Sequence, residues 1–248
     1  MTPTNDAGSW FETPVGRRCL GNEQRLVRQI LDRVFGEHFV QIGKWGEANA
    51  FLRHARTRRQ VLVGWDADDR EADMISGAEH LSLSTDSVDA VFLPHTLELT
   101  SSPHALLRES ERVLRADGHL IALGFAAAGP WGLRHLLARD GYPEGHRRMI
   151  RERRLRDWLQ LLGFEVAPAI AYCHTLPFER FRRLATFPRE RWAQRWARFL
   201  AGGYLLVAQK RVRVLTPLRA KWRRPPRLRA VGGLVEPTTR ASRTRESV

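Results

Sequence analysis

The chain has 248 residues, 43% of them hydrophobic, which is enough for one well-buried domain but not for two of the usual size. It shows no signal-peptide pattern and no run of about 18 apolar residues, so we expect a cytoplasmic protein without a membrane span. Its two cysteines, Cys19 and Cys173, lie in no metal-binding motif, and we expect both to be reduced and buried.

The formal net charge of +14 is concentrated at one end of the chain. Residues 211–248 hold 11 basic and 2 acidic residues, so they carry +9 of that charge. Their Pro, Gly, Ser, Thr and Arg content indicates disorder, and we expect a basic tail over residues 215–248. Such a tail can bind nucleic acid through salt-sensitive contacts. Alternatively, it is a solvated tail in a protein that uses 38 Arg against 3 Lys.

Hydrophobic periodicity predicts the elements of the first half of the chain. A helix is expected over residues 22–36, with an apolar stripe made of Leu26, Ile30, Leu31 and Val34. A strand over 39–43, a helix over 47–59 and a second strand over 60–66 follow. Strand, helix and strand in this order form the βαβ unit of a parallel sheet.

The second half continues the alternation. We expect a buried strand over 87–94, a helix over 103–118 capped by Ser102, and a strand over 119–125. A helix over 153–164 and strands over 164–174 and 202–212 complete the pattern. A helical stretch over 178–200, with Trp192, Trp196 and Phe199 on one stripe, separates the last two strands.

This alternation predicts a doubly wound α/β sheet with helices on both faces. The expected organisation is an N-terminal helical segment over 1–37, an α/β domain over 38–214 and the tail over 215–248. Ligands of such sheets bind beyond the carboxyl ends of the strands, where the strand order reverses. The residues that follow the predicted strands are therefore the candidates for a site.

One block carries a family resemblance. The segment "SLSTDSVDAVFLPHTLELTSSPHALLRESERVLRADGHLIALGF", residues 82–125, resembles the central block of class I S-adenosylmethionine-dependent methyltransferases of the type-11 group. "WFETPVGRRCLGNEQ" and "PHTLEL" resemble a bacterial branch of that group. The resemblance covers residues 39–214. It implies the Rossmann-like methyltransferase fold with an antiparallel last strand, S-adenosylmethionine as cofactor, and a small-molecule or other methyl acceptor.

The resemblance also assigns site residues by position. Gly43, Lys44 and Gly46 correspond to the cofactor turn, and Asp66 to the carboxylate that holds the ribose hydroxyls. The segment beside the adenine contains Ala78 and Glu79. Pro94 and His95 correspond to the end of the fourth strand, beside the transferable methyl group, where a neutral His95 can act as a general base.

Three positions depart from the pattern of the family's first motif. Gln41, Trp45 and Glu47 stand where the family has an acidic residue, a second glycine and a third glycine. In addition, only "ADDREAD" separates Asp66 from the next strand, so the third strand is expected to be short or absent. No His/Cys spacing near the turn suggests a cation, and we expect a metal-free site.

Each assignment has an alternative. The turn of Gly43 and Gly46 can be a tight strand-to-helix turn without a ligand, and Asp66 can be a turn residue or a helix cap. His95 can be a buried structural histidine.

Three hypotheses for function follow. The first is a methyltransferase with an unidentified acceptor. The second is an inactive protein of the same fold that acts as a binding module through its basic tail, and the third is an RNA-directed methyltransferase. The position of the Trp45 indole separates the first two hypotheses.

Overall fold

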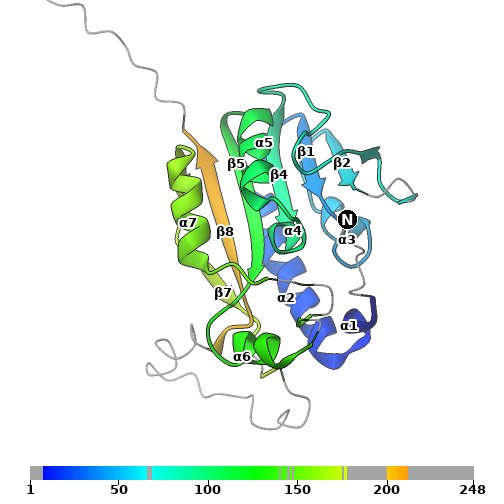
Figure 1. Ribbon diagram of the computed structural model, residues 1–248. Helices are drawn as coiled ribbons and strands as arrows, with labels where there is room; N and C mark the ends of the chain where they lie inside the picture. Colours follow the sequence, from blue (N-terminus) through cyan, green and yellow to red (C-terminus); the bar gives the residue numbers. More distant parts are fainter. Residues whose placement is uncertain are drawn as a thin grey trace, which may run out of the picture. The chain divides into compact units, whose positions relative to one another are not determined.

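The structure of the protein is a computed structural model, which describes residues 8–65, 69–139, 141–143, 146, 148–174, 176–177 and 200–211. Its strands form one sheet in the order β3-β2-β1-β4-β5-β8-β6, and β7 also pairs with β8 (Figure 1). The strands are β1 (His38–Ile42), β2 (Arg59–Gly64), β3 (Met74–Ile75), β4 (Val88–Pro94), β5 (Leu114–Phe125), β6 (Phe164–Val166), β7 (Ile170–Tyr172) and β8 (Gly203–Lys210). Strands β1 to β5 are parallel, and β8 is antiparallel to its three partners. The predicted mostly parallel sheet with an antiparallel last strand is confirmed.

Strand residues alternate between the two faces of the sheet, and each face has its own hydrophobic core. Phe39 and Phe92 pack in one core, whereas their neighbours Val40 and Val91 pack in the other. The first face is covered by α1 (Gly8–Glu12), α2 (Pro14–Leu31), α3 (Asn49–Leu52) and α6 (Pro130–Leu137). The second is covered by α4 (Thr96–Leu99), α5 (Pro103–Val113) and α7 (Glu152–Leu161). Figure 1 shows α5 and α7 in front of the sheet and α2 behind it.

Helix α2 differs from its predicted extent. It is capped by Thr13, whose hydroxyl accepts a hydrogen bond from the Gly16 amide at 3.0 Å, and Pro14 occupies its first turn. Its buried stripe is Gly16, Cys19, Glu23, Val27 and Leu31. The predicted stripe also faces the core, because Leu31 and Val34 are buried and Leu26 and Ile30 pack against them, but the buried Glu23 was not expected.

Two short elements have local causes. Strand β3 contains only Met74 and Ile75, which confirms the expected short third strand. Helix α3 ends at Leu52, well before the predicted end at residue 59, because the residues that follow include few apolar side chains for a core face. The predicted helix with Trp192, and the tail over 215–248, lie outside the described residues. Among the helices that are described, none has the length and apolar character to cross a bilayer.

The two cysteines form a disulfide, so the prediction of reduced thiols is wrong. Cys19 of α2 and Cys173, which directly follows β7, have Cα atoms 5.4 Å apart, within the usual range for a disulfide. Both residues are buried, as predicted. The error has a simple cause: 154 positions separate the two cysteines, and only the path of α2 across the sheet brings them together.

Candidate functional site

The turn after β1 needs its two glycines. Gly43 has φ +85° and Gly46 has φ +72°, in the left-handed region that side chains with a Cβ disfavour. The turn is held by the Gly43 amide, which donates to the Val63 carbonyl at 2.9 Å, and by the Gln41 side-chain amide, which donates to the Gly43 carbonyl at 3.0 Å. The sequence therefore encodes a fixed turn at the carboxyl edge of the sheet, between β1 and β4, where the strand order reverses.

Protein side chains already occupy the space beside both glycines. A Cβ on Gly43 would lie 3.0 Å from the Thr96 hydroxyl and 3.1 Å from the Trp65 indole. A Cβ on Gly46 would lie 3.2 Å from Leu20 of α2. These glycines permit close packing of the turn against the protein, and neither faces an open cradle.

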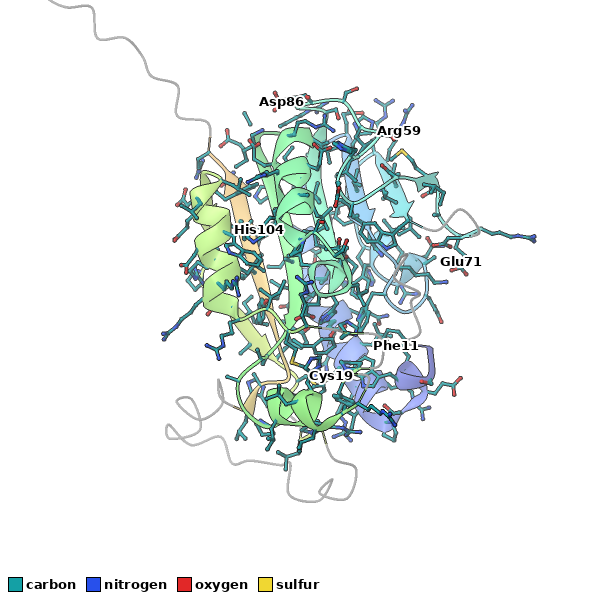
Figure 2. All side chains as sticks on the ribbon, in the orientation of Figure 1. Phe11, Cys19, Arg59, Glu71, Asp86 and His104 are labelled. Carbon is teal, nitrogen blue, oxygen red and sulfur yellow. A yellow bond between two sulfur atoms is a disulfide. The ribbon has the colours of Figure 1, made fainter. Side chains whose placement is uncertain are left out.

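The Trp45 indole fills the region between this turn and the end of β4. It is fully buried, and its Nε1 donates a hydrogen bond to a carboxylate oxygen of Glu23 at 2.8 Å. Its ring centroid lies 4.4 Å from that of His95 and 4.7 Å from that of Phe11 in α1. Figure 2 shows Phe11 and Cys19 at this carboxyl end of the sheet, with Asp86 and Arg59 at the opposite end.

His95 is held by two buried glutamates. It follows β4 with φ +57°, an uncommon value for a residue other than glycine, and its ring stacks on Phe125 at a centroid distance of 4.0 Å. Its Nε2 lies 3.2 Å from Glu23, and its Nδ1 lies 3.2 Å from Glu98. The imidazole is completely buried, so no part of it contacts solvent in this arrangement.

The two carboxylates decide the protonation of His95. Burial alone would lower the pKa of this imidazole, but the hydrogen bonds and charges of Glu23 and Glu98 outweigh burial and raise the pKa to about 9. Burial raises the pKa of Glu98, although His95 acts in the opposite direction. Near pH 7 the imidazole is therefore a cation with a proton on each nitrogen. In this state both ring nitrogens are hydrogen-bond donors, so the imidazole cannot act as a base and accept a further proton.

Glu98 and Tyr172 complete this network. Glu98 also accepts hydrogen bonds from the backbone amides of Phe125 and Ile150, at 3.1 and 3.3 Å. The Tyr172 hydroxyl donates to Glu23 at 3.0 Å, and burial, with the charge of Glu23, raises its pKa well above the usual value. Each oxygen of the two carboxylates thus has a donor, as buried charges require. We call Glu23, Trp45, His95, Glu98 and Tyr172 the buried network.

Sequence reasoning found the position of His95 but missed its partners. Glu98 was visible in principle, because it lies three residues after His95 in "PHTLEL". Glu23 could have been found as a charged residue at helical spacing from Cys19 and Val27. Tyr172 gave no local signal, because it reaches the network from 77 positions away.

The other predicted residues are spread along the carboxyl edge. Lys44 forms an ion pair with Glu71, in the segment after β2. Glu79 accepts a hydrogen bond from the Ser102 hydroxyl at 2.6 Å and is exposed, whereas Ala78 beside it is half-buried. Pro94, the last residue of β4, is buried. Asp66 lies outside the described residues. The structure therefore brings Gly43, Pro94 and His95 together through the pairing of β1 with β4.

One group of residues can supply metal ligands. His95, Glu98 and His146 are buried, and each offers an atom within 4.8 Å of the others, a composition that zinc sites use, although His95 becomes a ligand only after it has lost a proton. The expected absence of a metal stays a prediction.

The residues present do not fit the methionine end of S-adenosylmethionine in this arrangement. The family's second glycine is replaced by Trp45, whose buried indole packs against His95. The space that the absent Cβ atoms of Gly43 and Gly46 leave is filled by the side chains of Thr96 and Leu20. A methionine end bound beside His95 would require the indole to move.

The sheet order, with its reversal between β1 and β4 and its antiparallel β8 next to the edge strand, defines a class I methyltransferase fold. Among solved structures, a methyltransferase from Thermotoga maritima, described as a possible histamine N-methyltransferase, has a TM-score of 0.59, 18% identity and coverage of 84% of this chain and 96% of that one. A putative methyltransferase from Haloferax volcanii, in complex with the Trm112 activator, has a TM-score of 0.58, 16% identity and coverage of 83% and 96%. At these identities the comparison concerns the fold alone.

The sequence comparisons give the family. Residues 27–122 match the family described as "Methyltransferase domain". The uncharacterised protein YafS of Escherichia coli is 33% identical over 173 residues, which cover 69% of this chain and 70% of YafS. Mycobacterial relatives are 29% identical, and the chain spans 61% of their length. The chain belongs to the class I S-adenosylmethionine-dependent methyltransferase family, as the resemblance of residues 82–125 predicted.

Proposed function

We propose that the protein binds S-adenosylmethionine at the carboxyl edge of the sheet and transfers its methyl group to an unidentified acceptor. Support comes from the family, from the reversal of strand order between β1 and β4, and from the glycine turn that follows β1. The observation that carries the proposal is the match of residues 27–122 to the methyltransferase family, whose sheet order reverses between β1 and β4 in this structure. We propose that Gly43, Lys44, Gly46, Asp66, Ala78, Glu79 and Pro94 surround the cofactor.

Binding requires a state in which the Trp45 indole has left the buried network. His95 would then lie at the rim of the site. Only a neutral imidazole can accept a proton from a methyl acceptor, so catalysis by His95 would also require that its pKa fall from about 9. Its catalytic role stays a prediction.

Calorimetric titration with S-adenosylhomocysteine, the product form of the cofactor, tests the proposal. Trp45→Ala removes the indole, and Trp158→Ala is its matched control, because Trp158 packs on the opposite face beside His104. We expect Trp45→Ala to bind at least ten-fold more tightly than the Trp158→Ala control, and Asp66→Ala in the Trp45→Ala background to weaken binding. No heat from folded Trp45→Ala would contradict the proposal.

The buried Trp45 also favours a second candidate, a protein of this fold that binds no cofactor and acts through its basic tail. This hypothesis predicts no calorimetric signal from any variant. It also predicts that deletion of residues 217–248 lowers the affinity for RNA and flattens its salt dependence. Equal RNA affinity with and without these residues would rule out the role of the tail.

A further inference from the structure

The disulfide lies one helical turn from the residue that holds the Trp45 indole. Cys19 and Glu23 are four positions apart on α2, and both face the core. One carboxylate oxygen of Glu23 accepts from the indole, and the other accepts from Tyr172. The position of the first half of α2 therefore determines where Glu23 lies. Because Glu23 binds the indole, it also determines where the indole lies.

The other end of the disulfide is fastened to the sheet. Cys173 directly follows Tyr172 of β7, and the Gly202 amide donates to the carbonyls of both residues at 3.0 Å. The bond thus ties the first half of α2 to the sheet at a point beside the Tyr172 hydroxyl. Two links therefore join α2 to the end of β7. The disulfide connects Cys19 to Cys173, and a hydrogen bond connects Glu23 to Tyr172.

Helix α1 completes the cover over the indole. It precedes α2, and its Trp10 and Phe11 have ring centroids 5.6 and 4.7 Å from Trp45. Within the described residues, the disulfide is the covalent link between this N-terminal layer and the distant part of the sheet. A second feature acts in the same direction: the backbone of Cys173 has φ +53°, which is unfavourable for a residue with a Cβ and relaxes more easily once the bond is open.

We propose that the Cys19–Cys173 disulfide is a redox lock on the cofactor site: while it is closed, α1 and the first half of α2 keep the Trp45 indole in the buried network, and its reduction lets the indole leave. This inference rests on the proposed function and names a regulation of the same site.

The chemical step is a thiol–disulfide exchange with a dithiol reductant. The sulfur–sulfur bond accepts two electrons and two protons and gives two thiols, while the dithiol becomes a disulfide. Both sulfurs belong to buried residues, so the exchange requires a transient opening of the N-terminal layer and is expected to be slow.

The test compares S-adenosylhomocysteine binding in two redox states by calorimetry. The samples are the oxidised wild type, the wild type incubated with dithiothreitol until alkylation and mass spectrometry count two thiols, and Trp45→Ala in both states. The Cys19→Ser/Cys173→Ser variant mimics the open state and is the control for other effects of the reductant. Hydrogen exchange of residues 10–20 is the second readout.

We expect the reduced wild type and the double serine variant to bind at least ten-fold more tightly than the oxidised wild type, with faster exchange over residues 10–20. Trp45→Ala should bind equally in both states. Binding by Trp45→Ala together with equal affinities of the oxidised and reduced wild type would overturn the lock but not the proposed function. Absence of binding in every sample, Trp45→Ala included, would overturn both. If the double variant does not fold, the reduced wild type decides.

Discussion

The buried cation His95 makes the stability of the protein depend on pH in a calculable way. Its pKa is about 9 in the folded protein, against 6.5 for an ordinary histidine. The folded state therefore binds the proton more tightly than the unfolded state. The stabilisation is fully present below pH 6.5 and is lost as the pH rises through 9. A shift of this size corresponds to about 3 kcal/mol, at about 1.4 kcal/mol for each pKa unit.

Urea unfolding between pH 6 and pH 10 measures this effect, with His95→Gln as the reference. Glutamine keeps a polar side chain of similar length but does not titrate, so the contributions of groups outside the buried network cancel in the difference between the two proteins. We expect the free energy of unfolding of the wild type, relative to the variant, to fall by about 3 kcal/mol from pH 6 to pH 10. A difference that stays constant over this range would refute the buried cation.

Two further predictions concern stability. Opening the Cys19–Cys173 bond should lower the unfolding free energy by about 5 kcal/mol, because the bond closes a loop of 154 positions. Calorimetry with and without dithiothreitol should show a fall in Tm of about 10 °C or more. A fall of less than about 2 °C would contradict this prediction. Gly132→Ala should cost about 1–3 kcal/mol in urea unfolding, because its Cβ would fall on the backbone carbonyl of Ala127. Gly77→Ala, whose Cβ meets nothing within 4 Å, is the control and should change stability little; equal costs would show that the packing around Gly132 is misjudged.

The sheet was predictable because its strands are marked locally. Strand β4 is almost entirely buried, and such runs of apolar residues are typical of the middle of a parallel sheet. The "RESERVLRADGHL" segment placed α5 and β5, although β5 begins already at Leu114, within the predicted helix. The burial of Glu23 on α2 could not be predicted, because a charged residue on the core face is stabilised only by partners that come from other elements.

The glycine turn and the end of β4 could be placed from the sequence, but the contacts of their side chains could not. The glycines of the first turn and the strand end at His95 follow from local sequence and from the rule for parallel sheets. Whether the indole of Trp45 points toward a ligand or into the core depends on Glu23 and Tyr172, which lie far away in sequence. The disulfide depends on contacts of the same long range. No local pattern encodes such contacts.

The place of β8 in the sheet has a consequence for the order of assembly. This strand is the last of the described strands in sequence, yet it lies between β5 and β6 and pairs with β5, β6 and β7. During synthesis, β6 and β7 therefore emerge before β8, the strand with which they pair. Until β8 emerges, the backbone groups of β5 on that side have no strand to pair with. The half of the sheet beyond β5 can form only after residues 203–210 have left the ribosome, so it is completed later than the half that contains β1 to β5.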